Sequence, residues 1–216
     1  MTGAARTRAG AAAVALVCGL AYTALGLAVS QRPPGPFDRS AEPLAGWGVP
    51  VAWVFTASCL WPALVTAGIC ALVLAWRSPA WRARALFSVV LTVVAWQTSD
   101  LLKNLFKRPR PPYWVFHHET TFSYSSGHAL FATIVYGLWA YFIFRSALPA
   151  PLRWTLAALG VAWGLAVIWS RLALGAHYPT DLIGGVLLGA TFLGVGFAAL
   201  PHAFAPTSAA YSAANR

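Results

Sequence analysis

The stretch SRLALGAHYPTD, residues 170–181, places an arginine, a histidine and an aspartate at fixed intervals between two long apolar runs. His177 and Asp181 are four residues apart at the start of a predicted helix, and residues at this spacing share a helix face. A carboxylate can hold the proton on one imidazole nitrogen and leave the other nitrogen basic and aimed, as in catalytic triads. The spacing therefore predicts that His177 is a nucleophile, that Asp181 orients it and that Arg171 holds an anion.

Two further polar stretches carry residues suited to phosphate. In KNLFKRPRP, residues 103–111, Lys103 and Arg110 supply positive charge and N–H donors, to which Arg171 adds a second guanidinium fork. This set matches what a phosphate dianion needs.

The stretch YSSGH, residues 124–128, precedes an apolar helix. At Ser126 and Gly127 the free N–H groups and positive end of that helix favour an anion, and Gly127 lets the backbone approach closely. His128 can donate a proton to a leaving oxygen. We therefore predict phosphate binding at Ser126 and Gly127 and catalysis at His128.

Structural interpretations compete with these assignments. Lysine and arginine side chains at the ends of membrane spans usually extend to the membrane–water interface. A His–Asp pair at this spacing can simply cap a helix. Lys107 and Arg108 are expected to be solvated or to face lipid headgroups, and Asp100 could pair with Lys103. The joint occurrence of three polar stretches on one face favours the chemical interpretation.

No metal or cofactor is expected. His117, His118 and Glu119 could ligate a metal, but adjacent residues make poor chelating pairs. The cysteines fall inside apolar runs without a CxxC pair, which argues against a disulfide scaffold and a metal cluster; they are Cys18, Cys59 and Cys70.

The elements that position these residues must be membrane helices. The chain has 216 residues, of which 59% are hydrophobic and 9% charged, and its mean hydropathy is +0.64. A membrane-spanning helix needs about 20 apolar residues. Six runs meet this requirement, near residues 10–30, 51–76, 84–104, 128–146, 153–172 and 180–200. We therefore predict an all-α, polytopic membrane protein with six transmembrane helices in one bundle and one domain, residues 1–216.

The connections refine this prediction. Residues 31–50, rich in Pro and Gly, predict a loop rather than a helix, and the tail 201–216 is expected to be flexible. The first run could be a cleaved secretory signal, but its uncharged length favours a retained span. Gly185 and Gly189 form a GxxxG motif, which predicts close helix packing within one molecule and leaves a homodimer possible.

The charge distribution predicts the topology. With the N-terminus inside, the inner cations are Arg6, Arg8, Arg77, Arg82, Arg84, Arg145, Arg153 and Arg216. The outer cations are Arg32, Arg39, Lys103, Lys107, Arg108, Arg110 and Arg171. At least three of the outer cations are assigned to the site. When these are discounted, Lys and Arg are more frequent on the inner side. The positive-inside rule then favours cytoplasmic termini and an outer active site in the plasma membrane. Because the net charge of +10 is spread over both faces, it does not indicate a nucleic-acid partner.

The three stretches together resemble the signature of the type 2 phosphatidic acid phosphatase superfamily. Lysine is followed after six residues by Arg-Pro; Ser-Gly-His comes next; Ser-Arg, His and Asp complete the pattern within residues 103–181. One departure is Ser125, which stands where the family usually has proline.

The resemblance implies a metal-independent membrane phosphatase. His177 would attack phosphorus to form a phosphohistidine, and His128 would protonate the departing oxygen. The phosphoryl oxygens would be bound by Lys103, Arg110, Ser126, Gly127 and Arg171.

The substrate expected first is undecaprenyl diphosphate, with phosphatidylglycerophosphate or phosphatidate as the alternative. A phosphotransferase of the same superfamily remains possible. So does a protein that binds or transports lipid phosphate without catalysis, although it would not need the His177–Asp181 pair.

Overall fold

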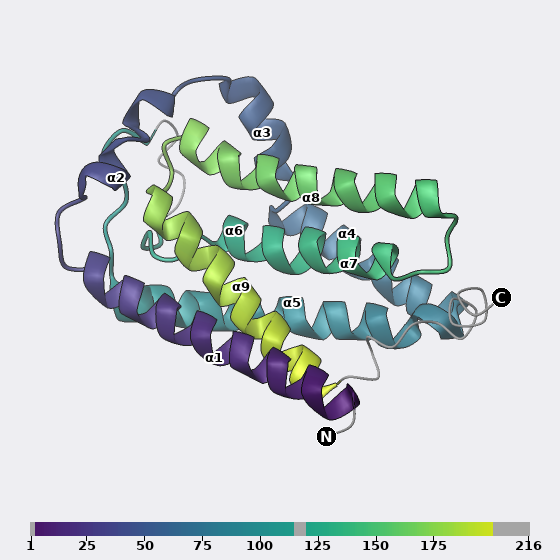
Figure 1. Ribbon diagram of the computed structural model, residues 1–216. Helices are drawn as coiled ribbons and strands as arrows, with labels where there is room; N and C mark the ends of the chain where they lie inside the picture. The colour runs from purple at the N-terminus through teal and green to yellow at the C-terminus, as the bar shows by residue number, and fades with distance from the viewer. Residues whose placement is uncertain (1–2, 115–119, 201–216) are drawn as a thin grey trace.

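The computed structural model describes residues 3–114 and 120–200, and the regular elements in these ranges are helices (Figure 1). Six segments are long and apolar enough to cross a membrane: Ala5–Val29, Val49–Arg77, Pro79–Phe106, Gly127–Phe144, Ala150–Ala173 and Pro179–Ala199. The predicted all-α, six-span architecture is confirmed, and the chain is a multi-pass membrane protein.

Four of the spans are single uninterrupted helices: α1 (Gly3–Val29), α5 (Pro79–Phe106), α8 (Ala150–Ala173) and α9 (Pro179–Ala199). Proline lies in the first turn of α5, α8 and α9. It is tolerated there because the first N–H groups of a helix have no partner within the helix. The third span, α5, is extended at both ends beyond the expected residues 84–104.

The second span is broken, contrary to the single run expected over residues 51–76. It consists of α3 (Val49–Ala57) and α4 (Trp61–Arg77). Tight backbone bonds from Ser58 to Phe55 and from Cys59 to Thr56 end α3, and Pro62 lies in the first turn of α4. As a result, α3 packs against α8 whereas α4 packs against α5.

The loop expected over residues 31–50 also contains short helices. These are α2 (Pro36–Arg39) and η1 (Glu42–Leu44), and α3 begins at Val49. The expectation of a wholly non-helical loop is therefore wrong. Pro36 and Pro43 lie in the first turns of the two short helices, because a proline that interrupts a long helix can still begin one. The short helix α2 contacts α9 and carries a buried carboxylate, Asp38.

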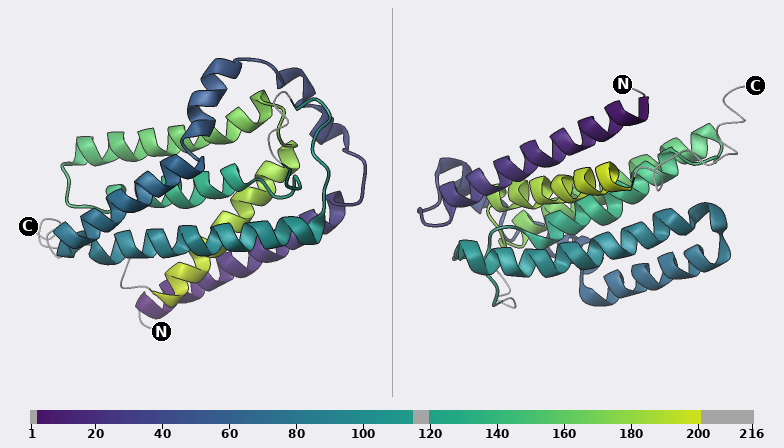
Figure 2. Two further views of the ribbon diagram at one scale, coloured as in Figure 1. Left: turned by 180° about the vertical axis from the view of Figure 1, so that it is seen from behind. Right: turned by 90° about the horizontal axis from the view of Figure 1, so that it is seen from below.

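The fourth span lies in the middle of the bundle. It runs through α6 (Gly127–Phe131), the π-helical turn η2 (Ala132–Gly137) and α7 (Leu138–Phe144). Its neighbours are α5, α8 and α9, and it contributes Leu130, Ile134 and Phe142 to the largest core cluster. Figure 2 shows α1 and α9 on one side of this span and the α4–α5 hairpin on the other.

Glycines let α9 approach the central span. A Cβ at Gly185 would lie 2.5 Å from the carbonyl oxygen of Ser126, and one at Gly189 would lie 2.7 Å from Cβ of Thr133. The GxxxG motif therefore serves packing within the molecule, as expected. This contact places the start of α9 directly against the start of α6.

Candidate active site

The three polar stretches meet at one end of the bundle. In Figure 1 the ends of α5 and α8 and the starts of α6 and α9 lie together at the left. Asp181 in the first turn of α9 accepts, through its backbone carbonyl, the N–H of Ser126 at 3.0 Å. His128 lies within electrostatic range of Arg171, His177, Lys103 and Arg110. The fold thus brings together residues that the sequence separates by up to 78 positions.

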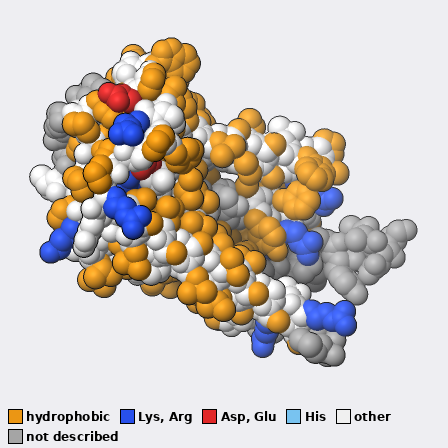
Figure 3. All heavy atoms as spheres, turned by 60° about the vertical axis from the view of Figure 1, so that its left-hand side comes forward, with side chains coloured by type: hydrophobic (Ala, Val, Ile, Leu, Met, Phe, Trp, Pro, Cys, Tyr) orange, Lys and Arg blue, Asp and Glu red, His pale blue; other side chains and the backbone are white. Residues whose placement is uncertain are grey.

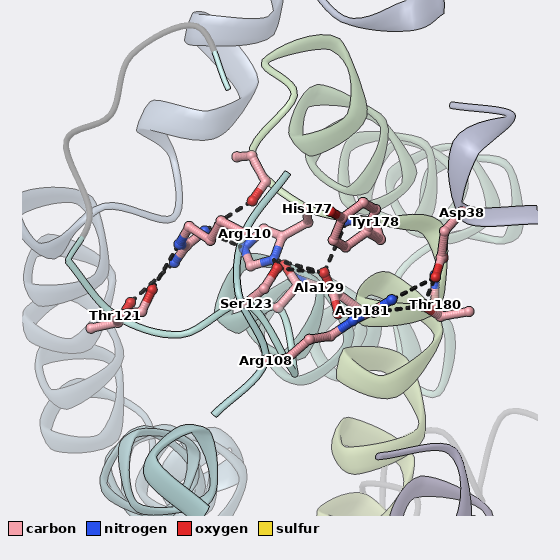
Figure 4. A network of polar contacts seen from close by, with 12 residues as sticks. Asp38, Arg108, Arg110, Thr121, Ser123, Ala129, His177, Tyr178, Thr180 and Asp181 are labelled. Carbon is pink, nitrogen blue, oxygen red and sulfur yellow. Dashed lines mark hydrogen bonds and ion pairs between the residues drawn. The ribbon is translucent and has the colours of Figure 1, made fainter. Parts of the chain in front are cut away.

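His177 lies in the connection between α8 and α9 and is 1% exposed. Gly175 adopts a φ of +67° in this turn, and a Cβ there would lie 2.8 Å from the carbonyl oxygen of Tyr113. The Nε2 atom of His177 is 3.2 Å from Arg110 Nη1, and its Nδ1 atom is 3.3 Å from Ser123 Oγ. The ring is thereby held from both sides (Figure 4).

These contacts identify the tautomer of His177. A guanidinium has N–H donors and no acceptor, so Nε2 must accept the bond from Arg110. The ring proton of the neutral imidazole then resides on Nδ1. This is the tautomer that a nucleophilic Nε2 requires.

Asp181 reaches His177 mainly through a serine. The distance from His177 Nδ1 to Asp181 Oδ2 is 3.6 Å, whereas Ser123 Oγ donates to the same carboxylate oxygen at 2.5 Å. Ser123 can accept from Nδ1 and donate to Asp181, which joins the three groups in one chain. Sequence reasoning missed Ser123, and it expected the carboxylate to contact the imidazole directly.

Asp181 also caps its own helix. Its Oδ2 accepts the backbone N–H of Tyr178 at 2.9 Å. Asp181 therefore does cap the helix, as the structural interpretation predicts, and the same carboxylate also accepts from Ser123. Whether Asp181 supports catalysis stays a prediction.

Arg108 is buried, contrary to the expectation that it is solvated. It is 2% exposed and forms ion pairs with Asp38 and Asp181 at 2.5 Å each. The residue before it, Lys107, is exposed as expected and ends α5 with a φ of 52°. This left-handed residue turns the chain, so that Arg108 points inward. The sequence offered no signal for Asp38, because its partner is 70 residues away.

Arg110 and Arg171 both donate to neutral oxygen atoms. Arg110 donates to the carbonyl oxygen of Thr121 at 2.8 Å and to that of Ala176 at 3.0 Å. Arg171 is 3% exposed and donates to Oγ1 of Thr56 on α3 at 3.1 Å. Threonine hydroxyls and carbonyl oxygens hold the two guanidiniums in place by accepting from their N–H groups, and guanidiniums are suited to bind the oxygens of an anion. The contact with Thr56 depends on the break in the second span.

Ser126 and Gly127 lie at the start of α6 as predicted. The Ser126 hydroxyl accepts the N–H of Ala129 at 3.4 Å as the helix cap, so its proton remains available to a ligand. A Cβ at Gly127 would lie 3.8 Å from Nζ of Lys103. The glycine and the lysine therefore face each other.

A cavity of about 440 Å³ opens between α4, α5 and α6. Lys103, Gly127 and His128 lie at its polar end, and the lining also includes the polar residues Ser99, Asp100, Thr120 and Thr121. Nε2 of His128 is buried without a hydrogen-bond partner among residues 3–114 and 120–200. The remaining wall is largely apolar and includes Trp61, Leu64, Val65, Val93, Trp96 and Phe131. Such a cavity suits a molecule with a phosphate at one end and a hydrocarbon chain at the other.

Tyrosines near the site remain neutral at ordinary pH. Burial, followed by the nearby Tyr178, Glu42 and Asp38, raises the pKa of Tyr113 to about 12. Burial likewise raises the pKa of Tyr178, over whose ring the Arg108 guanidinium lies at 4.5 Å. The Tyr178 phenol therefore acts as a neutral ring against which Arg108 packs. The suggested ligands His117, His118 and Glu119 and the tail 201–216 lie outside the described residues.

Comparisons with known proteins identify the family of the chain. The PAP2 superfamily model matches residues 81–204. Phosphatidylglycerophosphatase B of Bacillus subtilis is 38% identical over 93 residues, which are 42% of this chain and 45% of that protein. Lipid A 1-phosphatase of Rhizobium johnstonii is 31% identical over 175 residues, 76% of this chain and 68% of that protein. The match thus spans less than half of the first relative.

A solved structure shows the same fold. The crystal structure of a transmembrane PAP2-type phosphatidylglycerolphosphate phosphatase from Bacillus subtilis superposes with a TM-score of 0.55 at 24% identity. The superposition covers 91% of this chain and 94% of that one. The arrangement of six helices is therefore shared.

Proposed function

The chain belongs to the PAP2 superfamily, and on this basis we propose that it is a metal-independent lipid phosphate phosphatase that works through a phosphohistidine. The observation that carries the proposal is the contact of Arg110 with Nε2 of His177 at 3.2 Å. A guanidinium that binds a phosphate would present the phosphorus beside the nitrogen that attacks it. The tautomer that this contact requires leaves Nε2 unprotonated.

The mechanism assigns a role to each neighbour. As Nε2 attacks phosphorus, positive charge develops on the ring, and the Nδ1 proton faces Ser123 and Asp181. Lys103, Arg110 and Arg171 stabilise the phosphoryl oxygens, which is the main catalytic contribution in phosphoryl transfer. The N–H groups at the start of α6 and the Ser126 hydroxyl add donors.

His128 is the proposed general acid. It protonates the leaving oxygen of the lipid and afterwards takes a proton from the water that hydrolyses the phosphohistidine. Its position at the polar end of the cavity supports this role, because the lipid leaving group would occupy the apolar part.

The proposed substrate is a glycerol-based lipid phosphate, with phosphatidylglycerophosphate first. The relatives named phosphatidylglycerophosphatase B favour it over the undecaprenyl diphosphate expected from the sequence. The similarity to lipid A 1-phosphatase covers more of the chain and keeps a sugar-linked lipid phosphate as the second candidate.

Phosphate release by the purified protein in detergent with EDTA tests the proposal. We expect wild-type protein to release phosphate, and phosphatidylglycerophosphate to give a higher kcat/KM than phosphatidate, undecaprenyl diphosphate or lipid A 1-phosphate. EDTA should leave the rate unchanged. Loss of activity on chelation that zinc restores would contradict the metal-free mechanism. Absence of release from every lipid would favour the binding protein or the transferase.

The site is proposed to face outward. The acids that the structure describes all belong to elements at the site end: Asp38, Glu42, Asp100 and Asp181. Figure 3 shows acidic side chains at that end, whereas cations lie at both ends. An outward site leaves the cations at the other end of the bundle in the cytoplasm, in agreement with the positive-inside rule.

Cysteine labelling in intact cells tests this orientation. In a variant without its native cysteines, a cysteine at position 39 should react with a membrane-impermeant maleimide, because Arg39 is exposed beside the site. A cysteine at position 77, exposed at the end of α4, should react only after the cells are opened. The reverse pattern would overturn the outward orientation.

A further inference from the structure

A buried cluster of three ions adjoins the proposed nucleophile. Arg108 Nη2 contacts Asp38 Oδ2, and its Nη1 contacts Asp181 Oδ1, both at 2.5 Å. Asp38 is 3% exposed, Arg108 2% and Asp181 0%. Figure 4 shows Arg108 between the two carboxylates, with Ser123 and His177 beyond Asp181. Neither Asp38 nor Arg108 belongs to the residues proposed to bind phosphate.

Asp38 is held by more than its ion pair. Its Oδ1 accepts from the backbone N–H of Thr180 at 3.1 Å and from the Thr180 hydroxyl at 2.7 Å. Thr180 also accepts from Arg108 Nη1 at 2.7 Å. The short helix α2 is therefore fastened to the first turn of α9, one residue from Asp181.

The charges in this cluster do not cancel. Arg108 paired with Asp181 alone would form a neutral pair, and Asp181 would then contribute little negative potential at His177. With Asp38 on its other side, the cluster carries one net negative charge. A net negative charge stabilises the cationic imidazole that forms when His177 attacks phosphorus or takes up a proton.

We propose that Asp38 is a positioning residue for the reaction, which acts through Arg108 to keep Asp181 oriented and electrostatically negative toward His177. The inference rests on the proposed function of His177 as the nucleophile. It gives the loop between the first two spans a part in catalysis, although that loop contains none of the three motifs.

Among the residues that the structure describes, the other charged groups named near His177 do not supply this negative potential. Arg110 touches Nε2, and His128 on α6 lies within electrostatic range of His177, Lys103 of α5 and Arg171 of α8. These groups are cationic or titratable bases, so they oppose a positive charge on the ring. The effect of Asp38 is therefore expected to be visible in the protonation of His177.

The pH dependence of kcat/KM in Asp38→Asn tests the proposal. Without the Asp38 charge, Arg108 neutralises Asp181, the protonated ring is less stable, and the acid limb should move to lower pH by about half a unit or more. The value of kcat should fall about ten- to a hundredfold. Because the position of the acid limb does not depend on how much protein is folded, partial misfolding does not mimic the effect.

Glu42→Gln is the matched control. It removes one negative charge from an exposed residue of the same loop, and we expect the wild-type acid limb and kcat. The double variant Asp38→Asn with Arg108→Gln should return the acid limb toward wild type, because Asp181 again carries an uncompensated charge. An acid limb unchanged in Asp38→Asn, or one moved to higher pH, would overturn the proposal.

A titration without substrate separates this inference from the proposed function. In protein with ¹³C-labelled histidines, the NMR signal that is missing in a His177 variant reports the protonation of His177. Its midpoint should be lower in Asp38→Asn than in wild type and unchanged in Glu42→Gln. A lower midpoint in a protein that hydrolyses no lipid phosphate would contradict the proposed function alone. Equal midpoints in an active enzyme would contradict the role of Asp38 alone.

Discussion

Replacement of His177 by alanine is expected to lower kcat by about 10⁴-fold or more, because it removes the atom that attacks phosphorus. Arg110 and Ser123 lose one contact each, but Arg110 keeps its bonds to Thr121 and Ala176, and Ser123 keeps its bond to Asp181. The cations of the site therefore stay in place. Phosphate release from the preferred lipid, measured beside the melting temperature of the variant, separates loss of chemistry from loss of fold.

Trapping of the intermediate makes this test specific. Wild-type protein mixed briefly with ³²P-labelled substrate and quenched in base should carry label that acid removes, as a phosphohistidine does. His177→Ala should carry none, and peptide mapping should place the wild-type label at residue 177. Label on another residue, or more than a few percent of wild-type turnover in the variant, would show that His177 is not the nucleophile.

Asp181→Asn is expected to give the second largest effect, a fall in kcat of about 10³- to 10⁴-fold. All three of its partners donate: Arg108, Ser123 and the Tyr178 N–H. An asparagine amide must place its NH₂ group against at least one of them. If the amide faces Ser123, the serine proton turns toward Nδ1 of His177, and the ring proton moves to the nitrogen that should attack.

Single-turnover kinetics distinguish this role from helix capping. The rate of phosphoenzyme formation should fall with kcat in Asp181→Asn, and it should fall less in Ser123→Ala, which removes the bridge but keeps the carboxylate 3.6 Å from Nδ1. A destabilised variant with an unchanged rate of phosphoenzyme formation would mean that Asp181 serves only as a helix cap and an ion-pair partner.

Residues with a signal in the local sequence could be predicted, whereas residues that depend on a distant partner could not. Lys103, His128, Arg171 and His177 were predicted from residue type and spacing, because each lies at or next to the end of an apolar helix, and their roles in catalysis stay predictions. Arg108 was assigned to solvent, although it neighbours the predicted site. Its burial depends on Asp38, and nothing in the segment around Asp38 distinguishes that carboxylate from an ordinary loop residue.

The break in the second span likewise could not be predicted from the local sequence. The apolar composition of residues 49–77 satisfies the length of a membrane span whether the helix is continuous or not. The break becomes visible only in the tertiary structure, where α3 packs against α8 and α4 packs against α5. The packing of α3 against α8 brings Thr56 into contact with Arg171.

The sequence by itself determined the class of protein, the number of spans, the family and the residues predicted to carry the chemistry. Hydropathy and motif spacing are local properties, since bilayer thickness sets the helix length and the reaction sets the residue types. The tertiary structure decided the second layer of the site: the Ser123 bridge to Asp181, the Thr56 contact with Arg171, and the buried Asp38–Arg108–Asp181 cluster. These contacts depend on which helix ends meet, and that is decided by the packing of glycines and aromatic side chains across the whole bundle.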